Sequence, residues 1–91
     1  MNLQRVTFPE EAAQKLASLP VQVRHSVETF LENLDVLLRT APIGSISQRF
    51  ERDQEGGFVA RVDAVIVYFS LAPLSRAAIV QRIALPASPS R

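Results

Sequence analysis

The sequence predicts an α+β fold in which an N-terminal strand and a helical hairpin pack on an antiparallel sheet, in the order β-αα-βββ. Two segments with apolar residues at helical spacing meet at Leu19-Pro20, and the residue before a proline is pushed out of the helical region. After residue 57, short apolar runs alternate with turn residues, which is typical of successive hairpins.

A short strand and a helix are predicted at the start of the chain. Val6 and Phe8 stand at strand spacing, and the strand ends at Pro9. Proline suits the first turn of a helix, and the two glutamates after it are favourable near the positive end of the helix dipole. The helix is predicted to end near Leu19, and its small apolar side chains allow another helix to come close.

The second helix is predicted from Val21 to about Leu38. Its apolar residues recur every three or four positions: Val23, Val27, Phe30, Leu31, Leu34, Leu37 and Leu38. The predicted polar face carries Arg24, Glu28, Glu32 and Asp35. The short break between the helices predicts an antiparallel pair.

The remaining residues are predicted to form the sheet. Residues 40–47 are linker-like, 46–52 are predicted as an irregular strand, and 53–57 as a polar turn with two glycines. Two strands, 58–62 and 65–70, are predicted to pair across Asp63.

A turn at Ala72-Pro-Leu-Ser75 leads to the last predicted strand, 77–85. Successive hairpins indicate antiparallel pairing. The domain is therefore predicted to span residues 1–85. Residues 86–91 are predicted to form a C-terminal tail.

Composition limits the classes of function. The chain has 91 residues, a formal charge of +1 and no cysteine, so disulfides and thiolate metal sites are excluded and a reducing compartment is favoured. No apolar run approaches the ~20 residues of a membrane span, and no signal-peptide pattern is present. We expect a cytoplasmic protein that does not bind membranes.

Three stretches resemble the RelE/ParE family of bacterial toxins. RVTFPEEAAQKLASLPVQVRHSVETFLENL is similar to the opening strand and helical pair of that family, and FVARVDAVIVYFS with AAIVQRI is similar to its central and last strands. The resemblance covers about residues 2–85. It implies the toxin of a type II toxin–antitoxin pair, wrapped by a cognate antitoxin. RelE-like members cleave messenger RNA on the ribosome, whereas ParE-like members inhibit DNA gyrase.

The resemblance also implies site residues. The family usually carries a basic residue on each strand of the central hairpin. This chain has Arg61 on the first strand and Tyr68 on the second, but Val65 where the second basic residue usually lies. With Arg82 on the last strand, the catalytic set of a nuclease is Arg61, Tyr68 and Arg82.

Cleavage through a ribose 2′-hydroxyl requires a proton acceptor, cations for the phosphate and an acid for the leaving oxygen. Arginine stays protonated and is a poor base, and the nearest acids, Glu51, Glu55 and Asp63, fall in or beside predicted turns. The sequence therefore favours action by binding, as in ParE-like toxins. A RelE-like messenger RNA endonuclease remains the alternative.

Each candidate residue also has a simpler explanation. Arg61 can be a solvated residue of an edge strand. Tyr68 can be a core aromatic residue whose hydroxyl lies at the rim. Strand alternation places Arg82 on the same face as Val80, where it can be solvated. His25 has no second ligand at fixed spacing. No cofactor or metal is predicted.

The second central strand is apolar on both faces, and the helices cover only one of them. A partner would cover the other, either an antitoxin segment or a second copy of this chain. The third alternative is therefore a non-toxic, homodimeric interaction domain derived from a toxin. Gyrase or the ribosome with messenger RNA would be the target of an active toxin.

Overall fold

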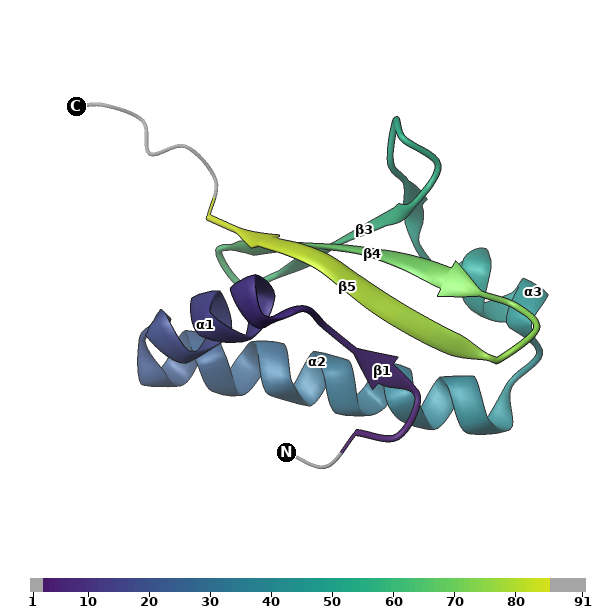
Figure 1. Ribbon diagram of the computed structural model, residues 1–91, viewed down its shortest axis with the longest axis horizontal. Coiled ribbons are helices and arrows are strands. Elements are labelled where there is room, and N and C mark those ends of the chain that lie inside the picture. Colours follow the sequence, from purple (N-terminus) through teal and green to yellow (C-terminus); the bar gives the residue numbers. More distant parts are fainter. Residues whose placement is uncertain (1–2, 86–91) are drawn as a thin grey trace.

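The computed structural model describes residues 3–85, and its helices lie on one face of a five-stranded sheet (Figure 1). The elements are β1 Val6–Thr7, α1 Glu10–Ser18, α2 Val21–Thr40, α3 Ile43–Ser47, β2 Glu51–Arg52, β3 Phe58–Val62, β4 Val65–Ala72 and β5 Ala77–Ala84. The predicted tail, residues 86–91, lies outside the described residues. None of the described helices is both long and apolar enough to span a membrane.

The strand order is β1-β5-β4-β3-β2. Antiparallel pairing is confirmed for β2 to β5. β1 differs from the prediction because it pairs with β5 in parallel, Val6 with Ala78 and Thr7 with Ile79, so the sheet is mixed. No hairpin connects these two strands, because the rest of the domain lies between them in sequence, so no tight turn imposes an antiparallel direction.

The segment predicted as an irregular strand, 46–52, is mostly not a strand. Pro42 precedes α3, and only Glu51 and Arg52 pair with β3. Proline favours helix initiation, and the helical turn directs Ile46 into the core, where it is fully buried. The strand prediction failed because a buried isoleucine fits either conformation.

The helical stripe is confirmed as one side of the core. Val27, Leu31, Leu34 and Leu38 of α2 are buried, and Val23, Phe30 and Leu37 are half-buried beside them. The sheet face towards the helices, the inner face, supplies the other side: Phe58, Val65, Val67, Phe69, Val80 and Ile83. Phe69 lies among aromatic rings, 5.2 Å from Phe50 and 5.7 Å from Phe58 between ring centroids.

The prediction that Asp35 lies on the solvent-exposed polar face of α2 is wrong, because this residue is only 3% exposed. Its Oδ1 accepts hydrogen bonds from the backbone N–H groups of Gln4, at 2.9 Å, and Arg5, and its Oδ2 is 3.3 Å from Arg39 Nε. Burial favours the neutral acid, but these bonds and the Arg39 charge outweigh it and hold the pKa of Asp35 below its ordinary value of 3.8. The carboxylate therefore ties the entry of β1 to α2.

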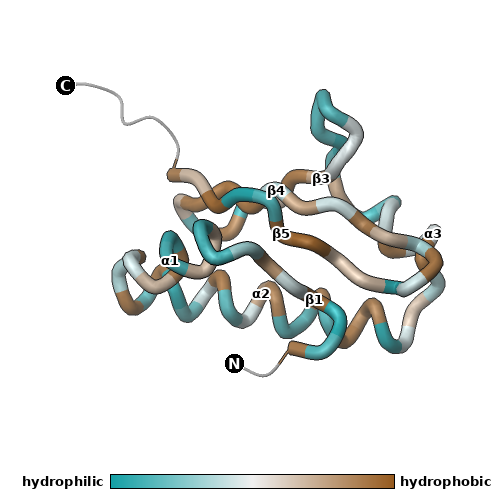
Figure 2. Tube along the Cα trace, viewed as in Figure 1, coloured by the Kyte–Doolittle hydropathy of each residue, from teal (hydrophilic) through white to brown (hydrophobic). Residues whose placement is uncertain are grey.

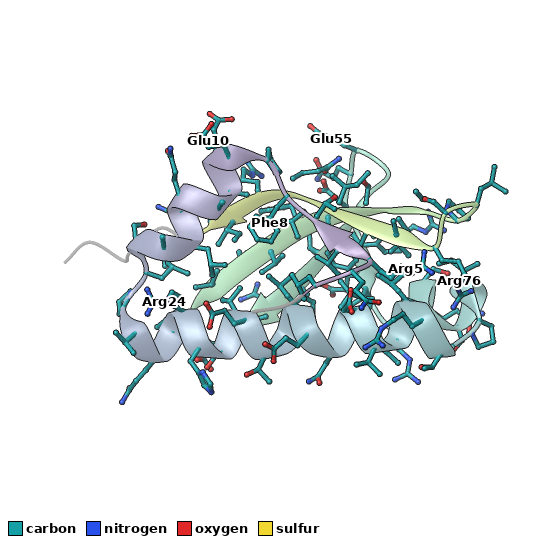
Figure 3. The ribbon with its side chains drawn as sticks, turned by 60° about the horizontal axis from the view of Figure 1, so that its bottom comes forward. Arg5, Phe8, Glu10, Arg24, Glu55 and Arg76 are labelled. Atoms are coloured by element: carbon teal, nitrogen blue, oxygen red, sulfur yellow. The ribbon has the colours of Figure 1, made fainter. Side chains whose placement is uncertain are left out.

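Arg76 joins the β4–β5 turn to the end of α2. Its backbone has a φ of 51°, in the left-handed region. Its Nε donates to the carbonyl of Leu38 at 2.8 Å, and its Nη2 donates to the carbonyl of Ala41. These contacts satisfy carbonyls that the end of a helix leaves without partners. Figure 3 shows Arg76 in this position beside α2.

Candidate functional site

The face of the sheet away from the helices, the outer face, carries no helix from residues 3–85 (Figure 1). The strand register aligns one row of side chains across it: Glu51 of β2, Val59 of β3, Tyr68 of β4 and Arg82 of β5. Antiparallel neighbours on one face lie close enough for their side chains to interact. The row therefore places two of the predicted site residues side by side.

Tyr68 and Arg82 form a stacked pair. The guanidinium carbon of Arg82 lies 4.1 Å from the centroid of the Tyr68 ring, within the range of a cation–π contact. Tyr68 is half-buried and Arg82 is exposed. The pair therefore places an exposed guanidinium beside a half-buried phenol at one place on the outer face.

A β-bulge puts Arg82 in this position, and the predicted face of Arg82 was wrong. Val80 pairs with Phe69 and Arg82 pairs with Tyr68, so Gln81 has no partner across the register shift. An extra residue reverses the alternation beyond it. As a result Val80 and Ile83 are both buried, whereas Gln81 and Arg82 are both exposed.

Asp53, Glu55, Tyr68, Gln81 and Arg82 line a cleft of about 400 Å³ on this face. One wall is the loop between β2 and β3, which rises above the sheet in Figure 1, is largely hydrophilic in Figure 2 and bears Glu55 in Figure 3.

Backbone hydrogen bonds close that loop. The N–H of Asp53 donates to the carbonyl of Gly57 at 2.8 Å, and the N–H of Gly56 donates to the carbonyl of Asp53 at 3.1 Å. Gly56 has a φ of 92°, which favours glycine. A Cβ on Gly57 would lie 2.9 Å from the carbonyl oxygen of Phe69, so only glycine lets the loop approach β4 this closely.

The charges around the cleft are balanced. A neighbouring hollow adds Arg52 and Val59 to the same walls, and the Arg52 guanidinium lies 5.3 Å from the centroid of Phe58. Two arginines therefore face two carboxylates, Asp53 and Glu55. The arrangement offers one phenol as a proton donor, carboxylates as acceptors and guanidinium groups for an anion.

Arg61 does not join this cleft. It pairs with Ile66, one row further along the sheet, and lines a separate hollow with Phe30, Arg49 and Phe50. The three predicted site residues are thus divided: Tyr68 and Arg82 lie together, and Arg61 opens onto another part of the surface.

The sequence prediction missed two lining residues and undervalued a third. The sequence places Asp53 in a polar turn and Glu55 in or beside one, and it gives no sign that Gln81 lines a site. A polar turn ending in two glycines hinted that 53–57 could fold over the sheet. No signal in the sequence marked the bulge at Gln81. Among residues 3–85, no group of three or more His, Cys, Asp or Glu is arranged to hold a metal ion, and His25 is exposed on α2.

Comparison with solved structures identifies the fold. The structure matches the toxin–antitoxin complex RelBE2 from Mycobacterium tuberculosis with a TM-score of 0.69 and 17% identity, covering 93% of this chain and 100% of that one. The fold is that of the RelE toxins. The isolated E. coli RelE toxin matches with a TM-score of 0.69 and 12% identity, over 93% of this chain and 86% of that chain.

The intact E. coli RelBE complex also shares the RelE fold, with a TM-score of 0.64 and 14% identity, over 92% of this chain and 98% of that one. No protein-family model matches the sequence, and no curated protein matches it. At these identities the likeness concerns the arrangement of helices and strands. The chemistry of the outer face must therefore be argued from this chain's own residues.

Proposed function

We propose that this chain is the toxin-like component of a type II toxin–antitoxin pair, that a cognate antitoxin binds it, and that it acts by binding its target rather than by cutting RNA. The fold supports the first part, because the solved structures that share it include RelBE toxin–antitoxin complexes. The side chains of the outer face support action by binding rather than by RNA cleavage.

The charge balance of the cleft carries the non-nuclease proposal. Binding of RNA draws most of its affinity from cations against phosphate, but Asp53 and Glu55 face Arg82 and Arg52 around this cleft. Arg61 lines a different hollow, and Val65, where the family usually has a second basic residue, is 1% exposed on the inner face. A phosphate-binding set of three cations is therefore not assembled at the Tyr68–Arg82 stack.

A second candidate, a messenger RNA endonuclease, is favoured by one observation. Asp53 and Glu55 line the same cleft as Tyr68 and Arg82, so a carboxylate lies beside a phenol and a guanidinium. In such a site a carboxylate would take the proton of the 2′-hydroxyl, Arg82 would stabilise the charged phosphate and Tyr68 would protonate the leaving oxygen. Arg61 has no part in this arrangement.

Tightly controlled expression in bacteria tests the proposal, with labelled precursors to follow translation and DNA replication. We expect growth to stop with replication affected first and ribosome-bound messenger RNA intact. Tyr68→Phe and Arg82→Ala probe the cleft. Lys15→Ala, an exposed position on α1, is the matched control and should behave like the unmodified chain.

The other outcomes separate the alternatives. Early arrest of translation with cleaved messenger RNA, lost in Tyr68→Phe, would replace the binding mechanism with the nuclease. Normal growth at confirmed soluble expression would contradict toxicity and leave the homodimeric interaction domain, which sedimentation at micromolar concentration would then test.

A further inference from the structure

The turn between β4 and β5 carries a leucine at its tip. Leu74 is 102% exposed, which makes it the most exposed large apolar residue in the part of the chain that the structure describes. Burial of an apolar side chain is the main favourable contribution to folding and to most protein association. The single chain gains nothing of this kind from Leu74.

Hydrogen bonds hold this turn in one shape. Within it, the N–H of Arg76 donates to the carbonyl of Pro73 at 3.3 Å, and the hydroxyl of Ser75 donates to the carbonyl of Ala72 at 3.4 Å. From β1, Arg5 Nη1 donates to the carbonyl of Ser75 at 3.3 Å, and the side chain of Arg76 is bonded to the end of α2. A leucine on a turn fixed in this way loses little conformational freedom when it binds a partner.

A mainly apolar hollow, the turn hollow, opens at the base of the same turn. Its volume is about 260 Å³. The residues that line it include Ile43 and Gly44 of α3, Phe58 of β3, Leu71 of β4 and Pro73 of the turn. An apolar cavity of roughly 150 Å³ is already large enough to bind benzene. The turn hollow can therefore hold one leucine side chain.

Leu74 and the turn hollow lie next to each other. Pro73 lines the hollow and directly precedes Leu74, and Figure 1 shows the β4–β5 turn and α3 at the same end of the molecule. Because Leu74 is fully exposed, it does not fill the hollow beside it. A surface that has an apolar projection next to an apolar hollow is complementary to a second copy of itself across a two-fold axis.

The charges around the two features are also complementary. Arg5 and Arg76 flank the turn, and Figure 3 shows them close together. Segment 51–57 borders the turn hollow through Arg52 and Gly56. That segment carries three carboxylates against one guanidinium, a net charge of −2. The two-fold arrangement would bring the two arginines of one copy near the acidic segment of the other, which favours association.

We propose that this end of the molecule is a two-fold interface between copies of the chain, in which Leu74 of each copy enters the turn hollow of the other. Ile43, Phe58 and Leu71 contact the incoming leucine, and the outer face of the sheet is not the interface. Neither Leu74 nor the residues of the turn hollow line the cleft of Tyr68 and Arg82. The pairing therefore does not depend on the proposed function.

Cysteine cross-linking tests which residues meet, because the chain has no cysteine of its own. Leu74→Cys and Ser47→Cys, the latter at the lining of the turn hollow, are made in separate whole chains, mixed and oxidised in air. A disulfide requires the two Cα atoms to come within about 7 Å. We expect the mixed dimer, identified by its mass, to form about tenfold faster than the dimer of Leu74→Cys with Val21→Cys. Val21 is an exposed apolar residue at the other end of α2.

Sedimentation tests the association itself. From about 10 μM to about 1 mM, we expect the unmodified chain to pass from monomer to dimer. Leu74→Asp should weaken the dimer about tenfold or more, because a carboxylate does not enter an apolar hollow without a partner. It should leave the midpoint of thermal unfolding unchanged, since Leu74 contributes no buried surface. Val21→Asp makes the same chemical change elsewhere and should leave the dimer intact.

Three results would overturn the proposal. The first is a chain that remains a monomer at about 1 mM, which would leave Leu74 and the turn hollow to a different protein. The second is a dimer that Leu74→Asp does not weaken. The third is cross-linking of Leu74→Cys to Val21→Cys as fast as to Ser47→Cys.

Discussion

The two faces of the sheet come from the same strands but differ in the burial and the chemistry of their side chains. On the inner face Val65, Val67 and Phe69 are at most 1% exposed and pack against α2. Between them on the outer face lie Ile66 and Tyr68, both half-buried, and Tyr68 pairs with Arg82 of β5. A core accepts any apolar set of suitable volume, whereas chemistry depends on individual groups. This difference explains how a fold can be shared at only 12–17% identity.

The largest expected difference between the faces is at adjacent positions on β4. Phe69→Ala should lower the free energy of unfolding by about 4 kcal/mol, because it empties a fully buried site among aromatic rings. Tyr68→Ala should cost less than about half of that. Denaturant titration followed by circular dichroism measures both. Equal losses would show that the outer face is also core. Phe69→Leu, expected to cost about 1.5 kcal/mol, keeps the test open if the alanine variant does not fold.

The buried carboxylate of Asp35 extends the comparison of the two faces to the helix side of the sheet. Asp35→Asn should cost about 2–3 kcal/mol at neutral pH, because Asp35 accepts two backbone N–H groups and pairs with Arg39. Since the pKa of Asp35 is held below 3.8 in the folded chain, its contribution is complete above that value and is lost as the pH falls through the lowered pKa.

Urea titration across acidic pH follows this dependence. The gap between the unmodified chain and Asp35→Asn should close as the acid becomes protonated. Asp63→Asn is the matched control: Asp63 is exposed in a turn with a φ of 53°, which asparagine tolerates. A gap that widens towards low pH would contradict the assigned role of the carboxylate.

The loop over the outer face can be separated from the sheet beneath it. Gly57→Ala should cost about 2 kcal/mol, because the new Cβ would meet the Phe69 carbonyl at 2.9 Å and push the loop from β4. Gly44→Ala, in α3 with open space around it, should instead gain up to about 1 kcal/mol. Thermal unfolding compares the two variants. If Gly57→Ala is neutral, the loop is not held closely against β4.

Two arginines provide the smallest contrast. Arg76→Ala should cost about 1.5 kcal/mol, since its side chain satisfies the carbonyls of Leu38 and Ala41 at the end of α2. Arg82→Ala, on the outer face, should cost about 0.5 kcal/mol or less. Amide exchange in the last turn of α2 gives a local measure and should quicken only in Arg76→Ala. The reverse order would make the Tyr68–Arg82 stack structural.

Most of the fold could be predicted from local patterns. The Leu19-Pro20 break, the apolar stripe of α2 and the turn at Asp63 each depend on residues near one another in sequence, and each is confirmed. Asp35 could not be placed in this way, because its partners are the backbone groups of residues some thirty positions earlier. Burial of that carboxylate depends on where β1 enters the sheet.

By itself the sequence determined the helical hairpin, the antiparallel strands and the inner face, because helix and strand periodicity are properties of a single segment. Only the tertiary structure decided which polar side chains meet. The bulge at Gln81 turned Arg82 onto Tyr68, the loop brought Asp53 and Glu55 over them, and the early end of β2 left Arg61 at a free edge beside Phe30 and Phe50. Which side chains become neighbours depends on strand register and on how segments far apart in the sequence come together, and no local sequence pattern encodes either.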